Sequence, residues 1–450
     1  MSHITLAAGV ILLLSGASGF CSAQALPRDD GYRGIWYEMG RKYSGGLGTY
    51  PQQQLPIAIY APAVKKTFFC YGGTVKGERR LLYMVSYYDH RTGRVPRPRI
   101  LFDKQTDDAH DNPTMALDEL GHIWIFGNSH GTARPSHIFR SDRPYDIDSF
   151  QQVLKTNFSY GQPWFIPGQG FMLMHTRYRQ GIRELFWMTS ADGMAWDEPR
   201  LLASFFGHYQ VTWRSGERVG SMFNCHPEGL DRRTNLYYVE TVDMGRKWTH
   251  AAGQSLQIPL TDIANPALVH DYRSEGLLVY LKDLQFDADG RPVLLYLTSR
   301  GHQPVPESGP RIWRTARWDG ARWIIRSVTT SDHNYHHGSL YIEEDGTWRV
   351  IAPTEPGPFP WDTGGEMVMW ISKDRGLTWR REKQLTRDSP RNHTYARRPV
   401  DAQPDFYALW ADGDTLKESP SFLYFATRDG RVFRLPPKMS GEFERPEEVK

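Results

Sequence analysis

The 450-residue chain carries 54 Lys and Arg residues against 51 Asp and Glu residues, a formal net charge of +3. This near balance gives no broad basic face, so we expect no nucleic-acid partner. Three cysteines are too few for a disulfide framework, although one bridge between Cys70 and Cys225 fits an oxidising compartment. Aromatic residues make up 13% of the chain, which suits short strands joined by tight turns and also sugar-binding clefts.

The N-terminus has the pattern of a cleaved secretory signal. Residues 6–20 form an apolar run too short to span a bilayer, and small residues follow up to Ala25. Cys21 offers the alternative of a lipoprotein anchor, but Phe20 stands where a small residue is required. We therefore predict a signal peptide over residues 1–25, a domain over 26–450, no membrane span, a secreted or periplasmic location and a monomer.

Strand-like runs recur along the whole chain. They are rich in β-branched or aromatic residues and end at Gly, Asp or Pro, at 57–60, 67–71, 81–88, 122–126, 170–175, 184–189, 235–240, 276–281, 293–298, 311–317 and 366–371. No long stretch has helical apolar spacing, so the sequence predicts an almost wholly β protein.

A repeated turn lies between these runs. The Asp-box pattern S/T-x-D-x-G-x-x-W occurs in full at 241–248 and 372–379, and in shortened form at 190–196. In such a turn Asp caps the backbone, Gly takes a positive φ, and Trp packs against the same hairpin. Turns of this kind spread over the chain predict a single-domain β-propeller. Seven blades give about 60 residues per blade, more than the ~40 to 50 residues of compact propeller repeats. Six blades fit the same length.

Polar clusters interrupt the strands. His110 and His130 lie twenty residues apart and flank the run at 122–126, so a hairpin can bring both to one end of a blade. Further clusters contain His175 and Arg177, and lie at 332–338 and 392–398. Because a propeller gathers side chains from successive strand ends at its axis and one face, we predict a shared site there. The alternative for each cluster is a hydrogen-bonded loop or a tunnel lining.

Metal-binding patterns are weak. His333 and His337 are the candidate metal ligands, and Cys225 with His226 adds a thiolate, but no C-x-x-C or H-E-x-x-H spacing is present. We expect no required cofactor, with a structural Ca²⁺ or Zn²⁺ ion as the alternative.

Several stretches together resemble one family of propellers. They are Tyr-Ser-Gly-Gly-Leu-Gly-Thr-Tyr at 43–50, Phe-Phe-Cys-Tyr-Gly-Gly-Thr at 68–74, Asp-Asp-Ala-His-Asp-Asn-Pro at 107–113, Ser-His-Gly at 129–131 and Arg-Pro-Ser at 134–136. They resemble the BNR-type seven-bladed propellers that include rhamnose–glucuronate lyases, first described as rhamnosidases, and more distantly the propeller ulvan lyases. The resemblance implies a polysaccharide lyase whose partner is an acidic polysaccharide or oligosaccharide.

The same resemblance implies candidate sites on opposite propeller faces. In the rhamnose–glucuronate enzymes a histidine after the Gly-Gly-Leu-Gly-Thr-Tyr motif carries the reaction, but Gln54 occupies the aligned position, and glutamine cannot accept a proton near neutral pH. The ulvan lyases use a histidine pair with nearby Tyr and Arg. The pair His110 and His130 is similar in spacing, with Tyr178 and Arg177 as companions.

A uronate lyase must neutralise the carboxylate, remove the C5 proton and release the group on C4. Arg suits the first task, and a histidine with a pKa of ~6.5 suits the second. We expect His110 to be the base, Tyr178 the acid, Arg177 the carboxylate neutraliser and His130 a second acid, base or orienting group. The substrate-binding candidates are Gln54, Asn112, Arg134 and Arg397.

Two other functions fit the same fold. A rhamnosidase-like or sialidase-like glycoside hydrolase is one, although the convergent arginines and the Tyr nucleophile with Glu of a sialidase are not found in the sequence. A non-catalytic carbohydrate-binding propeller is the other, favoured by Gln54.

Overall fold

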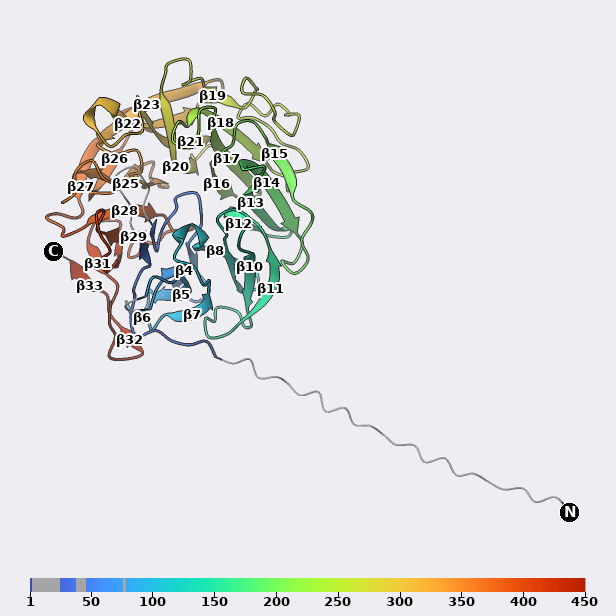
Figure 1. Ribbon diagram of the computed structural model, residues 1–450, viewed down its shortest axis with the longest axis vertical. Helices are drawn as coiled ribbons and strands as arrows, with labels where there is room; N and C mark the ends of the chain where they lie inside the picture. The colour runs from blue at the N-terminus through green and yellow to red at the C-terminus, as the bar shows by residue number, and fades with distance from the viewer. Residues whose placement is uncertain (2–24, 38–45, 76–77, 450) are drawn as a thin grey trace.

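A computed structural model describes residues 1, 25–37, 46–75 and 78–449, so almost all of the predicted signal peptide lies outside the described residues. Seven antiparallel sheets stand in a ring around a central axis, each forming one blade (Figure 1). This confirms the all-β, seven-bladed, single-domain propeller. The described part of the chain contains two short 3₁₀ turns, η1 (Ala109–Asp111) and η2 (Pro306–Ser308), and no helix long and apolar enough to cross a membrane.

Each blade is an antiparallel meander whose strands follow one another in the chain, except that the short strand β6 (Val95–Pro96) intervenes in blade 1 and β32 (Phe443–Glu444) intervenes in blade 7. The strands of blades 1 to 3 are β3 (Ala58–Ala61), β4 (Lys66–Gly73), β5 (Leu82–Asp89) and β7 (Arg99–Asp103); β8 (Pro113–Leu117), β9 (Ile123–Gly127), β10 (Ser136–Ser141) and β11 (Phe150–Thr156); and β12 (Ser159–Ile166), β13 (Gly170–Arg179), β14 (Ile182–Ser190) and β15 (Arg200–Ala203). The strands of blades 4 and 5 are β16 (Gln210–Ser215), β17 (Arg218–Cys225), β18 (Thr234–Thr241) and β19 (Leu268–His270); and β20 (Leu278–Phe286), β21 (Pro292–Ser299), β22 (Arg311–Trp318) and β23 (Trp323–Ser331).

The last two blades complete the ring. Their strands are β24 (Ser339–Ile342), β25 (Trp348–Glu355), β26 (Glu366–Ser372) and β27 (Arg380–Gln384); and β28 (Asn392–Arg397), β29 (Ala408–Gly413), β30 (Leu423–Ala426), β31 (Val432–Arg434) and β33 (Glu447–Val449). The first strand of each blade lies nearest the axis (Figure 1). We call the end of the ring where these first strands begin the entry face; because the strands alternate in direction, the second strand of each blade ends there.

The middle strands are buried on both sides because each blade packs between two others. β4 and β18 are buried over nearly their whole length, so these strands are mostly apolar without a clear alternation. The strands nearest the axis are more polar. The Gln162 amide in β12, for example, donates to the carbonyl of Gln210 at the start of β16 at 3.1 Å.

The Asp-boxes form the predicted turns. In the box at 241–248, Thr241 Oγ1 accepts from Gly245 N at 3.0 Å, Asp243 Oδ1 accepts from Lys247 N at 2.9 Å, and Gly245 has φ 79°. Trp248 also contacts Trp187 of blade 3, with ring centroids 5.4 Å apart. The box therefore ties neighbouring blades together in addition to closing its own hairpin.

Segments near both ends of the chain close the ring. Gly34 bridges to Gly73 of blade 1 and to Ser421 of blade 7. Two short strands add a further contact, because β32 (Phe443–Glu444) pairs with β6 (Val95–Pro96) beside blade 1. A separate two-stranded sheet joins β1 (Trp36–Tyr37) to β2 (Gly46–Leu47).

The segment from Thr49 to Gln54 fills the axis at the entry face. Arg397 of blade 7 donates to the carbonyls of Thr49 and Pro51 at 3.2 and 2.7 Å and also to that of Gln54. Gln162 donates to the carbonyl of Gln53 at 2.9 Å. Side chains of the blades thus hold this segment in place as an axial plug.

The two cysteines of the described domain are not bridged. Cys70 and Cys225 are both buried and free, in blades 1 and 4. The suggestion of a disulfide between them is therefore wrong, because the fold places them in different blades.

Candidate functional site

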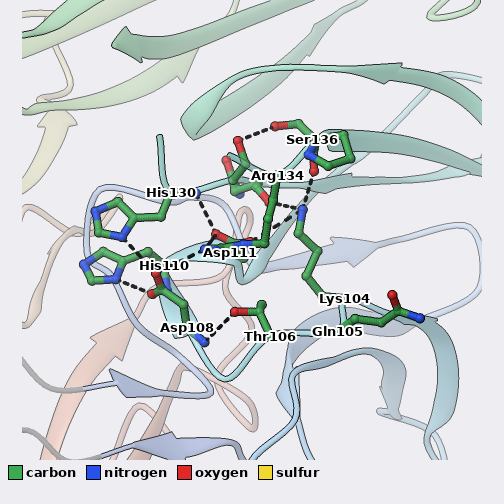
Figure 2. Close-up of polar contacts among 12 residues, drawn as sticks. Lys104, Gln105, Thr106, Asp108, His110, Asp111, His130, Arg134 and Ser136 are labelled. Atoms are coloured by element: carbon green, nitrogen blue, oxygen red, sulfur yellow. Dashed lines mark hydrogen bonds and ion pairs between the residues drawn. The ribbon is translucent and has the colours of Figure 1, made fainter. Parts of the chain in front are cut away.

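The predicted histidine pair forms a single cluster on the entry face. His110 lies in the turn η1 just before β8, and His130 follows β9 of the same blade. Their imidazoles stack, with ring centroids 3.9 Å apart and planes 16° from parallel. Figure 2 shows both rings beside Asp108, whose Oδ1 accepts from His110 Nδ1 at 2.6 Å and whose Oδ2 accepts from His130 Nδ1 at 2.9 Å. One carboxylate therefore orients both rings.

The local sequence explains this geometry. Asp108 caps η1, and its Oδ1 accepts from the backbone N of His110 at 3.0 Å. Because the turn places the His110 side chain beside the capping carboxylate, one aspartate fixes both the backbone and the ring. Pro113 then ends the turn and starts β8.

A layer of charged groups lies beneath the pair. Arg134 donates to Asp111 Oδ2 through Nε at 2.7 Å and to Asp108 Oδ2 at 3.2 Å. Asp111 is fully buried and accepts from the backbone N of His130 at 2.6 Å. Lys104 Nζ lies 3.6 Å from Asp111 Oδ2, and burial lowers the pKa of Lys104 to about 8. Arg134, predicted to bind substrate, thus positions the carboxylates that hold the histidines.

The two histidines differ in their surroundings. Burial lowers the pKa of His110 to about 4, despite the opposing effect of Asp108. Its Nε2 contacts the hydroxyl of Tyr50, whereas the His130 side chain is 33% exposed. Burial acts to raise the pKa of Asp108, but hydrogen bonds from both histidines hold it well below its usual value. His110 is therefore neutral and Asp108 is ionised, and His130 is the imidazole of the pair that is open to solvent.

Tyr178 lies beside the pair at the end of β13. Its ring centroid is 6.2 Å from that of His130, and its hydroxyl accepts from Arg183 at 3.0 Å. Burial raises the pKa of Tyr178, with Arg183 opposing the rise. Tyr178 is therefore protonated at neutral pH, and its hydroxyl is hydrogen-bonded to Tyr160 as well as to Arg183.

Arginine side chains stack on tyrosine rings next to Tyr178. The Arg183 guanidinium, from blade 3, lies 3.6 Å from the ring centroid of Tyr209. The Arg233 guanidinium, from blade 4, lies 4.3 Å from the same centroid. Burial acts to raise the pKa of Tyr209, but these two cations bring it below its usual value. Tyr209 and Arg233 line a small hollow at the axis, together with Tyr50, Pro51, Gln53, Tyr160, Tyr335, His337 and Tyr395.

The remaining predicted residues lie in different settings. Arg177 is half-buried, and its Nε donates to the carbonyl of Asn157 at 3.1 Å. Asn112 is buried and donates to the carbonyls of Leu47 and Tyr50 at 2.8 and 2.6 Å. Gln54 is buried and donates to the carbonyl of His110 at 2.5 Å. Together with Arg397, these two residues hold the axial plug and the neighbouring turn η1, which accounts for their burial. Contact of these residues with substrate stays a prediction.

Among the described residues, the predicted metal ligands His333 and His337 do not belong to a group of three or more metal-ligand side chains. His333 Nδ1 accepts from the backbone N of Tyr335 at 3.1 Å, and the His337 ring stacks on Tyr395 with centroids 5.0 Å apart. Three ligand-type atoms within 4.8 Å of one another occur at Asp108, His110 and His130. Both of these histidines direct Nδ1 at the carboxylate, so the arrangement fits hydrogen bonding without an ion.

Sequence reasoning missed several residues of this cluster. Asp108 and Tyr50 lie in motifs that carry the family resemblance, but no role was predicted for either residue. The position of Asp108 in a turn, two residues before His110, is the signal that could have identified it. Arg183 and Arg233 had no comparable signal, since they are two of 54 basic residues and neither belongs to a motif.

Comparisons with known proteins agree with this fold. The ulvan lyase PL25 of Pseudoalteromonas sp. (strain PLSV) is 21% identical over 93% of this chain and 92% of its own length, and an ulvan lyase of Nonlabens ulvanivorans is 23% identical over 62% and 66%. The solved structure of a PL25 ulvan lyase superposes with a TM-score of 0.71 at 17% identity, covering 90% of this chain and 97% of that one. The sequence profile of the BNR repeat-containing family matches residues 78–331. Since that match spans more than half of the chain, this protein belongs to the BNR repeat-containing family.

Proposed function

We propose that this chain is a secreted polysaccharide lyase that cleaves a uronate-containing acidic glycan by β-elimination. The observation that carries the proposal is the shared Asp108, which holds two stacked imidazoles with one of them open to solvent. The related PL25 protein was solved bound to -[GlcA(1-4)Rha3S]-, which makes a glucuronate–rhamnose glycan the first candidate substrate.

The geometry favours His130 as the base, in place of His110. Asp108 accepts from Nδ1–H of His130, so the lone pair on Nε2 is free to take the C5 proton of the uronate. The electron pair of the C5–H bond forms the C4–C5 double bond, and the C4–O bond breaks. His110 is buried and bonded to Tyr50 and Asp108, which suits an orienting role.

Two neighbours complete the elimination. Tyr178 lies next to His130 and gives its hydroxyl proton to the departing glycosidic oxygen. Arg183 is better placed than Arg177 to neutralise the uronate carboxylate, because it bonds the Tyr178 hydroxyl and because its buried Nη2 has no hydrogen-bond partner among the described residues. Proton exchange of His130 and Tyr178 with water then restores the starting state.

The test is a screen of ulvan and other uronate polysaccharides for the ultraviolet absorbance of the unsaturated uronate product. We expect product with the native protein and none with His130→Ala. His270→Ala is the matched control, because this part-exposed histidine lies in the outer strand β19 of blade 4. Reducing ends without unsaturated product indicate a hydrolase, and binding without any cleavage indicates a carbohydrate-binding propeller.

A further inference from the structure

A second pocket opens on the entry face next to the axial hollow. Its lining combines three arginines with one histidine and one acidic residue: Arg232, Arg273, Arg300, His302 and Glu228. We call this the arginine pocket. Arg232 and Thr234 line it, whereas Arg233 between them lines the axial hollow, so the two cavities share one wall.

We propose that the arginine pocket binds an anionic group, a sulfate ester or a carboxylate, on a sugar residue beyond the one that is cleaved. The proposal rests on the proposed function for the class of substrate, an acidic glycan. It assigns this surface to recognition of the polymer, separately from the chemistry at the histidine pair.

The charges in the pocket are incompletely balanced. Arg232 pairs with Glu228 at 2.7 Å. Of the residues that the structure describes, no carboxylate lies within 4.0 Å of the Arg273 or Arg300 guanidinium, and Glu275 nearby pairs with His270 instead. Other arginines on this face, such as Arg134, lie directly on carboxylates. Two uncompensated guanidiniums lining one hollow repel each other, and an oxyanion with several acceptor oxygens satisfies both.

The walls of the pocket are fixed before any ligand arrives. The buried Asn235 Oδ1 accepts from the backbone N of Arg273 at 2.8 Å. On the other side, the backbone N of Arg300 donates to the carbonyl of Ser308 at 3.0 Å, and the buried Asn334 donates to the carbonyl of Gly301 at 2.9 Å. Buried side chains thus hold the backbone of both arginines while their charged ends stay in solvent, an arrangement that lowers the entropy lost on binding.

The position of the pocket suits an extended chain. Arg232 follows β17 and Arg300 follows β21, just as His130 follows β9 and Tyr178 lies at the end of β13. All four residues therefore lie where the second strand of a blade reaches the entry face. A glycan can place one uronate at His130 and extend past Arg233, which separates the axial hollow from the arginine pocket. A sugar residue further along the same glycan then lies at the arginine pocket.

The experiment compares the native protein with the double variant Arg273→Gln/Arg300→Gln on ulvan and on chemically desulfated ulvan. We expect KM on ulvan to rise roughly two- to fivefold for each arginine, the range of an exposed charge pair, with kcat unchanged. The salt dependence of KM should weaken as well. A rise confined to the sulfated polymer identifies a sulfate ester, and a rise on both polymers identifies a carboxylate. Arg246→Gln, an exposed arginine in an Asp-box turn on the opposite face, is the control.

Failure of this inference is distinguishable from failure of the proposed function. Product formation with an unchanged KM in the double variant overturns the arginine pocket alone. If the native protein forms no product, affinity electrophoresis in ulvan still reports binding, and weaker retardation of the double variant supports the pocket while the lyase proposal fails. A native protein that neither cleaves nor binds ulvan or any other uronate polysaccharide of the screen overturns both. Equal melting temperatures are expected, because the changed side chains are exposed.

Discussion

The imidazole of His110 stacks on that of His130 at 3.9 Å, and both rings donate Nδ1–H to the two oxygens of Asp108. Two cationic imidazoles at this distance repel, and burial already lowers the pKa of His110 to about 4. The pair therefore holds at most one extra proton near neutral pH. Asp108 also orients His130, the ring of the pair that is part-exposed.

Asp108→Asn should reduce kcat by about 10²-fold or more, because an amide cannot stabilise the imidazolium formed when His130 takes a proton. The isosteric change keeps the turn, so circular dichroism should be unchanged. Asp107→Asn is the matched control, since that neighbouring carboxyl is exposed and pairs only with Arg79 at 3.3 Å among the described contacts. Full activity of Asp108→Asn would show that the shared carboxylate has no part in catalysis.

The two histidines should separate catalysis from stability. His130→Ala should abolish product formation with little change in the free energy of unfolding, because the side chain is 33% exposed. His110→Ala should destabilise the fold by about 2 kcal/mol, because it leaves buried partners unsatisfied. Urea unfolding and kcat measured on both variants test this. The assignment of the base reverses if His110→Ala is folded and inactive while His130→Ala retains turnover.

Arg183→Lys should lower kcat/KM on a uronate glycan at least tenfold, since a lysine cannot hold the Tyr178 hydroxyl and a carboxylate in one fork. Arg177→Lys should change kcat/KM less than twofold if its guanidinium only donates to the Asn157 carbonyl. Kinetics on the same polymer decide between the two arginines. A larger loss from Arg177→Lys would restore the assignment made from the sequence.

The sequence predicted the middle strands of the blades far better than the strands at the axis, and none of the outermost strands overlaps a predicted run. All eleven predicted runs overlap strands of the structure, because β-branched and aromatic residues suit strands buried on both faces. β12 and β16 were missed. They carry Gln162 and Gln210, whose amides donate to backbone carbonyls of the neighbouring blade, and such polar residues weaken the strand signal.

The site was predictable where one local turn makes it and not where distant blades meet. His110, His130 and Asp108 belong to a single blade, so sequence spacing alone brought the two histidines together. Arg183 of blade 3 and Arg233 of blade 4 both contact the ring of Tyr209, and the packing of one blade on the next that brings them together cannot be read from sequence spacing. The role of Arg397 in holding the axial plug was not foreseen either, since the sequence of a strand end does not distinguish a substrate ligand from a residue that anchors the backbone.

Buried neutral histidines should make the fold sensitive to acid. His208 is fully buried, its Nε2 accepts from the backbone N of Phe205 at 3.1 Å, and its Nδ1 contacts the carbonyl of Asn224 at 2.8 Å. A proton on Nε2 would face another donor, and burial accordingly lowers the pKa of His208 to about 4 from the ordinary 6.5. The unfolded chain binds this proton as the pH falls through 6.5, whereas the folded chain does not until about pH 4. Stability present above pH 6.5 is therefore lost between these values, by on the order of 3 kcal/mol for this residue.

His208→Gln removes that titration while keeping one acceptor and one donor. Its free energy of unfolding should fall less steeply than that of the native protein between pH 7 and 4.5, measured by urea unfolding at each pH. His270→Gln, a part-exposed histidine paired with Glu275, should leave the native slope unchanged. Because His110 and His175 are also buried with lowered pKa values, a shallower but still positive slope is expected in the His208 variant. Parallel curves for the native protein and His208→Gln would mean that the folded protein admits a proton at His208 without cost, against the contacts that its two ring nitrogens make.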